Sequence, residues 1–322
     1  MARAADPPAN ADPFSRARLA SIGLALSAAF AWATYYLFVL WVTPGTSAGA
    51  VLFYPFLAGG VVWLAVVAVG PDRRAVGPLI VDPGTYLRVA LLVGMQLSVL
   101  AATYLAGPVD ASLLSLLGDV VVTPLLAVAM LVTSRSVVGH PLFLAGLLLS
   151  LGGGTLAIVG GHRLAAVHGA GWLPVVGAPL TVGLYFLVSA RAAERLPIGA
   201  IVGVTTIVAA GVVLLLAPLL PGGWRGIATI GPRPLALLGI NGVVSFFLGP
   251  WAYFRAIARE GYVLGPMLMT GIPVFTLVLS ALVLHLPVAE LALVGIPIAV
   301  VGGVCVVHAT ASPAPRPVAP AG

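Results

Sequence analysis

The sequence contains no lysine, a single cysteine (Cys305) and few charged residues of either sign. Asp, Glu, Lys and Arg make up 7% of its 322 residues, whereas a typical soluble domain has about 25%. One cysteine excludes a disulfide framework within the chain. Hydrophobic residues make up 61% of the sequence. The composition therefore excludes a soluble protein and predicts an integral membrane protein whose surroundings are a lipid bilayer.

The 15 basic residues are all arginines, and they lie between the apolar runs, at their ends or outside them. The net charge of +6 is not concentrated in a basic cluster with interleaved aromatic residues, so we expect no nucleic-acid partner. The histidines lie at the ends of apolar runs or in loops, without the regular spacing of metal ligands. We therefore expect neither a metal nor a cofactor.

Long apolar runs dominate the chain. A membrane-spanning helix needs about 20 apolar residues, and the sequence has ten runs of this kind. We expect an all-α membrane protein with ten transmembrane helices, and disordered ends over 1–18 and 310–322, which are rich in Ala and Pro. The predicted spans are Leu19–Val42, Ala48–Val69, Tyr86–Ala106, Val109–Thr133, Pro141–Gly160, Gly171–Ala190, Gly199–Leu220, Pro234–Phe254, Val263–Leu284 and Leu291–His308.

The distribution of arginines predicts the orientation of the chain. With the N-terminus in the cytoplasm, twelve arginines fall on the cytoplasmic side and three on the other, Arg163, Arg225 and Arg233. Cytoplasmic loops carry the excess of positive charge in membrane proteins. We expect a multi-pass protein of the plasma or inner membrane with both termini in the cytoplasm.

An internal repeat relates the two halves of the chain, 19–165 and 166–309. At a shift of 149 residues Tyr36 coincides with Tyr185 and Pro124 with Pro273, since 185 − 36 and 273 − 124 are both 149. A repeat of five spans enters the membrane from opposite sides in its two copies. Such inverted repeats are typical of secondary transporters, whose substrate site lies near the membrane midplane between the halves.

Small residues recur in the fifth and tenth predicted spans, also at the shift of 149. Gly146 and Gly154 are eight residues apart, as are Gly295 and Gly303. Such ladders let helix backbones approach closely. We expect these two helices to pack against each other as structural elements.

The fourth predicted span carries the only carboxylate well inside an apolar run, Asp119. Ser112, Ser115, Asp119 and Thr123 share one helical face, and Pro124 removes a backbone hydrogen bond beside it. A charge in hydrocarbon is costly, so it usually faces a cavity or a helix interface. One interpretation is a cavity in which Asp119 alternates between a proton and a cationic substrate. The alternative is a structural aspartate at a packing face.

Other polar or aromatic side chains fall near the middle of predicted spans. Gln96 and Asn241 are candidates for hydrogen bonds to a substrate, or to a neighbouring helix. Trp32 and Tyr36, four residues apart, and Tyr185 are the deeper aromatic residues, and ring faces attract ammonium groups. Ordinary core packing is the alternative for each of these rings. We also expect Pro273 to break the ninth span, as Pro124 breaks the fourth.

The sequence resembles the EamA family of the drug/metabolite transporter superfamily. The resemblance lies in the segments Ala111–Leu131 and Gly265–Leu284, each bearing a proline and each followed by a glycine-bearing helix, Pro141–Gly161 and Glu290–Val307. It implies a transporter of small metabolites, amino acids or drug-like solutes, most often an exporter coupled to protons. Where the family often has a Gly-Glu pair between these helices, this chain has Val137 and Leu286, so no role of that glutamate is carried over.

These features predict a proton-coupled secondary transporter. An uncoupled facilitator or exchanger with a structural Asp119 is the first alternative. An intramembrane enzyme needs two or more convergent catalytic groups, and the sequence offers one mid-span carboxylate without a partner at the same depth. We therefore expect no enzyme. The partners implied are a small-molecule substrate, protons and the bilayer.

Overall fold

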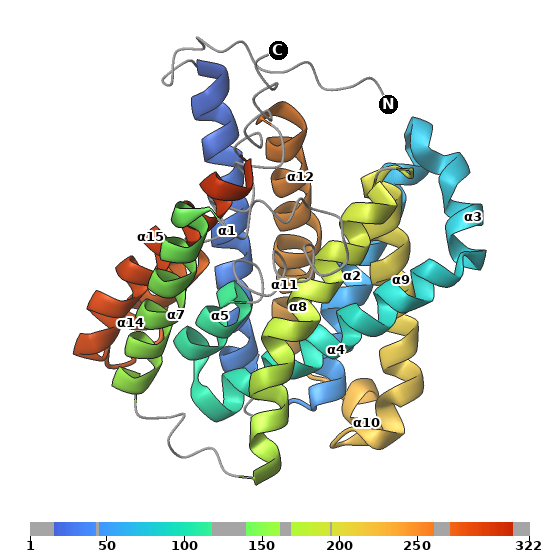
Figure 1. Cartoon of the computed structure of the whole chain (residues 1–322). Coiled ribbons are helices and arrows are strands. Elements are labelled where there is room, and N and C mark those ends of the chain that lie inside the picture. The colour runs from blue at the N-terminus through green and yellow to red at the C-terminus, as the bar shows by residue number, and fades with distance from the viewer. Residues whose placement is uncertain are drawn as a thin grey trace, which may run out of the picture.

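The structure is a computed structural model that describes residues 16–42, 45–117, 140–161, 169–193, 195–260 and 271–311. Within these ranges the chain is helical and has no strand. Figure 1 shows long helices crossing one another at different tilts, with α7, α14 and α15 together on one side of α1 and with α2 and α9 on the other side. The predicted all-α class is confirmed.

The helices follow one another with short connections. The first half contains α1 (Arg16–Val42), α2 (Ala48–Val69), α3 (Val76–Val81), α4 (Pro83–Ala106), α5 (Pro108–Leu117) and α7 (Pro141–Gly161). The second half contains α8 (Trp172–Ala193), α9 (Ile198–Leu216), α10 (Gly223–Ala228), α11 (Pro232–Asn241), α12 (Gly249–Glu260), α14 (Ile272–Val283) and α15 (Glu290–Ala311). A π-helix, η7 (Gly242–Leu248), joins α11 to α12, and short 3₁₀ turns are Pro71–Ala75, Gly169–Gly171 and Ala217–Leu219.

Six helical stretches in the described residues are long and apolar enough to cross a membrane. They correspond to the first, second, third, sixth, seventh and eighth predicted spans, and three shorter apolar helices correspond to the fifth, ninth and tenth. The fourth predicted span is described only as far as the end of α5 at Leu117. The membrane character is thus confirmed, and the number of ten spans stays a prediction.

The start and end of α4 illustrate how the sequence positions these helices. The Asp82 carboxylate accepts a hydrogen bond from the Gly84 N–H at 3.1 Å, and Pro83 occupies the first helical position, where its missing N–H costs nothing. The helix ends at Gly107, whose φ of +96° suits a residue without a Cβ. Pro108 then begins α5. Both ends of α4 are therefore encoded locally.

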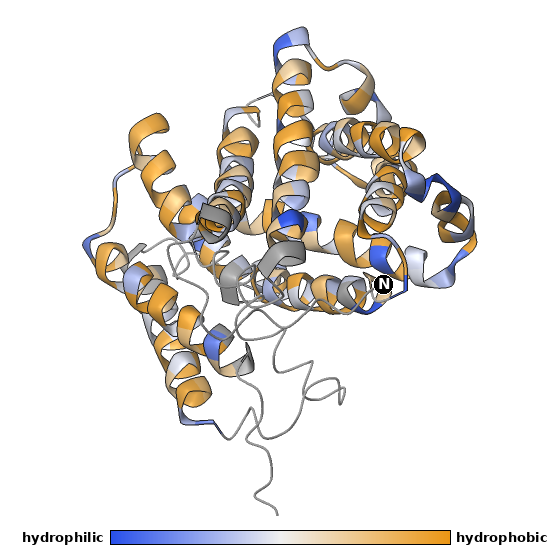
Figure 2. Ribbon diagram, turned by 90° about the horizontal axis from the view of Figure 1, so that it is seen from above, coloured by the Kyte–Doolittle hydropathy of each residue, from blue (hydrophilic) through white to orange (hydrophobic). Residues whose placement is uncertain are grey.

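Apolar side chains cover the outside of the helices as well as the inside. Leu148 is 71% exposed, Leu215 77% and Leu282 69%. Figure 2 shows hydrophobic residues around most helices, with hydrophilic residues concentrated at turns and helix ends. A helix that is hydrophobic all round is typical of a membrane span, so these exposed residues are suited to lipid.

Most of the large helix contacts join one half of the chain to the other. α2 packs on α9, α4 on α8, α1 on α12 and on α14, α5 on α14, and α7 on α15. The two halves are therefore interleaved, and no boundary between two separate units runs through the described residues.

The α7–α15 pair has the closest approach between two backbones. A Cβ on Gly146 would lie 2.7 Å from the Gly302 carbonyl oxygen, and one on Gly295 would overlap the backbone of Gly153 and Ala157. The helices run antiparallel, because Gly146 faces Gly302 while Gly153 faces Gly295. These pairs are related by the same shift, since 146 + 149 = 295 and 153 + 149 = 302.

The contacts of this pair involve Gly153 and Gly302, one residue before the Gly154 and Gly303 of the expected ladder. Gly154 and Gly303 are also buried. The spacing from Gly146 to Gly153 is seven residues, which keeps side chains on one seam of a helix pair better than eight. Because residues 152–154 are all glycine, the sequence did not indicate which of them faces the other helix.

Candidate functional site

A cavity of about 120 Å³ lies between helices of both halves. Its walls come from α1, α4 and α5 of the first half and from α8, α9, η7, α12 and α14 of the second. The described residues that line it are Trp32, Tyr35, Tyr36, Leu92, Met95, Gln96, Val99, Ser115, Val182, Tyr185, Phe186, Val202, Thr206, Ser245, Phe246, Pro250, Phe254 and Ile272. Five of the eight candidate proton or substrate residues, Trp32, Tyr36, Gln96, Ser115 and Tyr185, are among them.

Aromatic rings form much of the wall, and α1 supplies three of them. The Trp32 ring lies 6.3 Å from that of Phe186 on α8 and 5.4 Å from that of Tyr253 on α12. Tyr35 meets Phe246 of the π-helix edge-on, with the ring centres 6.0 Å apart. Edge-to-face contacts of this kind are favourable. They hold large rings in place around an open space instead of filling it.

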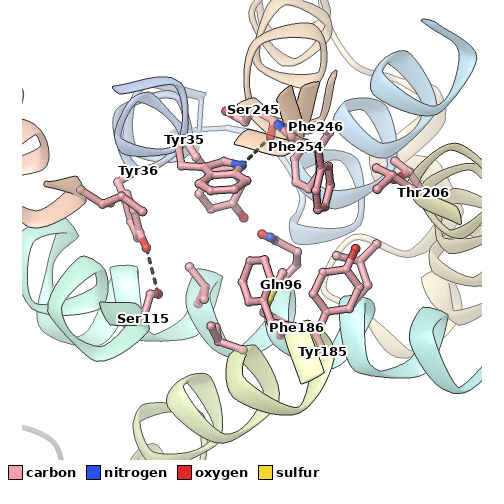
Figure 3. A pocket seen from close by; sticks show the side chains of 18 residues that line it. Tyr35, Tyr36, Gln96, Ser115, Tyr185, Phe186, Thr206, Ser245, Phe246 and Phe254 are labelled. Atoms are coloured by element: carbon pink, nitrogen blue, oxygen red, sulfur yellow. Dashed lines mark hydrogen bonds between the residues drawn. The ribbon is translucent and has the colours of Figure 1, made fainter. Parts of the chain in front are cut away.

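One polar contact of the wall joins α1 to α5. Tyr36 donates a hydrogen bond from its hydroxyl to Ser115 Oγ at 2.9 Å, and Ser115 donates in turn to the Ala111 carbonyl at 3.0 Å. Figure 3 shows this bond at one end of the cavity. The contact fixes the distance between α1 and the helix that precedes Asp119 in the sequence.

Two polar atoms of the cavity have no hydrogen-bond partner in the part of the chain described. They are the Tyr35 hydroxyl and Gln96 Oε1, and both are buried. Figure 3 shows Tyr35, from α1, and Gln96, from α4, reaching into the same space. A buried polar atom without a partner costs about 1–3 kcal/mol, so these atoms are expected to meet water or a ligand.

The π-helix beside the cavity has an identifiable cause in the sequence. Pro250 has no N–H, so it cannot donate to a carbonyl one helical turn earlier, in the stretch that contains Ser245 and Phe246. Trp32 Nε1 donates to the Ser245 carbonyl and Trp63 Nε1 to the Phe246 carbonyl, each at 2.9 Å. Indole groups from α1 and α2 thus replace the missing backbone donor. π-Helical turns occur often at functional sites, and this one supplies Ser245 and Phe246 to the cavity.

Asn241, a candidate for a hydrogen bond to a substrate or to a neighbouring helix, is not among the described residues that line the cavity. Its side chain is fully buried at the end of α11, where Oδ1 accepts a hydrogen bond from Ser245 Oγ at 2.8 Å. Pro273 lies in the first turn of α14, at a position where its missing N–H removes no helical bond. It does not interrupt α14, which begins at Ile272. Asn241 Nδ2 is buried without a hydrogen-bond partner among the described residues, and the role of Asn241 stays a prediction.

Asp119, Thr123 and Pro124 lie outside the described residues. Among the described residues of the lining, none carries a charge at neutral pH. The polarity of the described wall comes instead from hydroxyl, amide and indole groups. Roles for the three residues after α5 rest on the sequence alone.

Comparison with known proteins identifies the second half of the chain. The model of the EamA-like transporter family matches residues 169–308. These residues are therefore similar to the EamA-like transporter family, which is part of the drug/metabolite transporter superfamily. The match suggests a membrane transporter and points away from an enzyme.

The fold of the EamA-like chain as a whole is shared with a solved structure. A crystal structure of a protein 21% identical in sequence superposes with a TM-score of 0.63, over 88% of this chain and 95% of that one. At this identity the likeness concerns the fold alone. None of the curated proteins compared with the chain matches it.

The sequence interpretation missed several residues of the EamA-like cavity. Phe246 and Phe254 are separated from Trp32 by more than 200 positions, so no local pattern connects them. Tyr253 lies near the end of the eighth predicted span, and it is 7% exposed and packs on Trp32. The Gly-Pro pair at 249–250 was the one local signal that could have revealed the altered helix.

Proposed function

We propose that the protein is a proton-coupled secondary transporter that exports small metabolites, amino acids or drug-like solutes through the central cavity. The observation that carries this proposal is the cavity itself, an aromatic-walled space with buried polar groups that is lined by helices of both halves. Trp32, Tyr36, Gln96, Ser115 and Tyr185 would contact the substrate there. Ligand sites in transporters of inverted repeats lie between the repeats.

Alternating access is supported by the way the helices pair. The shift of 149 residues relates α1 to α8, through Tyr36 and Tyr185, and α4 to α12, through Tyr104 and Tyr253. The contact of α1 with α12 therefore has a counterpart in the contact of α8 with α4. Two related sets of contacts around one site allow the halves to exchange conformations, which opens the cavity to either side in turn.

Proton coupling is assigned to Asp119 on the sequence. Asp119 follows Ser115, a cavity residue, by four positions, which is about one turn if the helix continues. Carboxyl groups within membrane spans serve as proton carriers in pumps and transporters. We place both termini in the cytoplasm and the protein in the plasma or inner membrane, as the arginine distribution predicts.

A transport assay in liposomes tests this function. Purified protein is reconstituted and offered a panel of amino acids, amines, alcohols and amides, with and without an imposed pH gradient, beside Asp119→Asn. We expect at least one solute to accumulate against its gradient only when protons flow, and Asp119→Asn to lose that coupling. Equal transport with and without the gradient in both proteins would instead identify an uncoupled facilitator with a structural Asp119.

A further inference from the structure

The two unpartnered polar atoms of the cavity restrict the chemistry of what binds there. The Tyr35 hydroxyl lies on a ring that is 5% exposed, and Gln96 is 8% exposed. Both atoms are buried without a hydrogen-bond partner in the described part of the chain, and both residues line the cavity. They come from different helices, α1 and α4, and reach into one space (Figure 3).

The two atoms require complementary partners. Gln96 Oε1 only accepts hydrogen bonds, so its partner must donate. The Tyr35 hydroxyl carries a proton that needs an acceptor. A single group that satisfies both must donate and accept. Hydroxyl and primary or secondary amide groups do this, whereas an ammonium only donates and a carboxylate only accepts.

The other described residues of the wall also favour an uncharged ligand. Its members are aromatic, aliphatic or neutral polar residues, and the other polar contacts, Tyr36 with Ser115 and Trp32 with the Ser245 carbonyl, are already paired. A charged group buried among them would lose its hydration without an ionised partner from the described lining. An aromatic or aliphatic body, in contrast, fits the rings of Trp32, Phe186 and Phe246.

We propose that Tyr35 and Gln96 form the polar subsite of the cavity and select a neutral hydroxyl or amide group on a compact apolar body. This inference rests on the proposed transport function, and among the solutes named there it favours uncharged ones over amino acids, which carry both charges. Because the proposed proton carrier is Asp119 and not the substrate, the substrate itself needs no charge. The preference is therefore expected against ammonium and carboxylate ligands of the same size.

Five probes that share a phenyl ring and a short chain test the subsite. They are 2-phenylethanol, 3-phenylpropanamide, 2-phenylethylammonium, 3-phenylpropanoate and ethylbenzene. Binding is measured by titration calorimetry on full-length protein in nanodiscs, with empty nanodiscs as the blank. We expect the alcohol and the amide to bind roughly 5- to 10-fold more tightly than the other three, as expected for one to two net hydrogen bonds.

Substitutions assign the preference to the two side chains. Gln96→Met and Tyr35→Phe, which keep the volume and remove the polar atom, should each reduce the preference for the alcohol over ethylbenzene several-fold. Gln96→Glu should shift the preference toward the ammonium, a gain that a misfolded protein cannot show. Tyr86→Phe is the matched control, because the Tyr86 hydroxyl donates to the Ile80 carbonyl on the exposed surface.

The outcomes separate this inference from the transport proposal. Equal binding of all five probes, tighter binding of either charged probe to the wild type, or no binding at all would overturn the subsite, and so would a preference unchanged in both variants. The same probes are then tested in liposomes. Selective binding without transport would support the polar subsite and contradict the transport function. Proton-driven transport without selectivity among the probes would support the transport function and contradict the polar subsite.

Discussion

The α7–α15 pair and the central cavity are both built from apolar helices, yet they have opposite packing. In the pair, glycines at 146, 153, 295 and 302 bring backbone onto backbone and leave no room even for a Cβ. Around the cavity, rings from α1, α8 and α12 contact one another edge-on or tilted and border a space of about 120 Å³. Small residues close an interface and large rigid ones hold a space open. Residue size, rather than hydrophobicity, therefore distinguishes the close helix contact from the cavity in this protein.

The largest effect is expected where a Cβ is added to the closed interface. Gly302→Ala would press a methyl group into the backbone and side chain of Ser150, and overpacking costs about 1–3 kcal/mol. The thermal midpoint of the purified protein should fall clearly. Gly152→Ala is the control, because nothing lies within 4 Å of the added group and alanine favours the helix. Equal midpoints would show that the two helices can separate without cost.

Substitution of the two indoles that donate to the π-helix should distinguish an effect on stability from an effect on binding. Trp32→Phe and Trp63→Phe each leave one carbonyl without its donor, at an expected cost of about 1–3 kcal/mol. Only Trp32 lines the cavity. We expect similar losses of thermal stability in both variants and a loss of probe binding in Trp32→Phe alone. Equal losses of binding would mean that the π-helix, and not the ring of Trp32, forms the site.

A smaller effect is expected from single hydrogen bonds in the two regions. Tyr36→Phe removes the 2.9 Å bond to Ser115 in the cavity wall, and Ser150→Ala removes the 3.3 Å bond to the Ala299 carbonyl in the α7–α15 pair. Each should cost about 1 kcal/mol or less. Transport rate should change in Tyr36→Phe and stay unchanged in Ser150→Ala. The opposite assignment would contradict the division into a binding region and a structural region.

The smallest effect concerns Asp82, outside both regions. Partial burial favours the neutral acid, but the Gly84 N–H and the hydrogen bond and charge of Arg88, 3.0 Å away, outweigh it and lower the pKa of Asp82. A lowered pKa in the folded state stabilises the protein above the pKa of the unfolded chain, about 4, and this stability is lost as pH falls through the folded value.

Thermal unfolding of wild type and Asp82→Asn between pH 7 and pH 3 measures that contribution. The variant should be less stable at pH 7 by roughly 0.5 kcal/mol, a small figure because the Asp82 side chain is 38% exposed and screened by solvent. The difference should vanish toward low pH. A difference that persists at pH 3 would show that Asp82 acts through the neutral cap of α4 and not through its charge.

The positions of the cavity residues show how far local patterns reach. Trp32, Tyr36, Gln96, Ser115 and Tyr185 were identified because polar or aromatic residues in the middle of an apolar span are rare. Asn241 met the same criterion, but it is buried outside the cavity and accepts a hydrogen bond from Ser245, one turn further along the same helical stretch. Depth in a span is visible in the sequence, but the direction that a side chain faces depends on the neighbouring helices.

The sequence by itself determined the membrane class, most helix boundaries and the small-residue ladders, because hydropathy, capping residues and Gly or Pro act over a few neighbouring positions. Only the tertiary structure decided which faces meet: that Gly153 lies against the backbone of α15, that Phe246 lies beside Tyr35, and that Trp32 and Trp63 donate to carbonyls of the π-helix before Pro250. These contacts join residues more than 140 positions apart. Their partners are chosen by the packing of the whole bundle, which no local pattern contains.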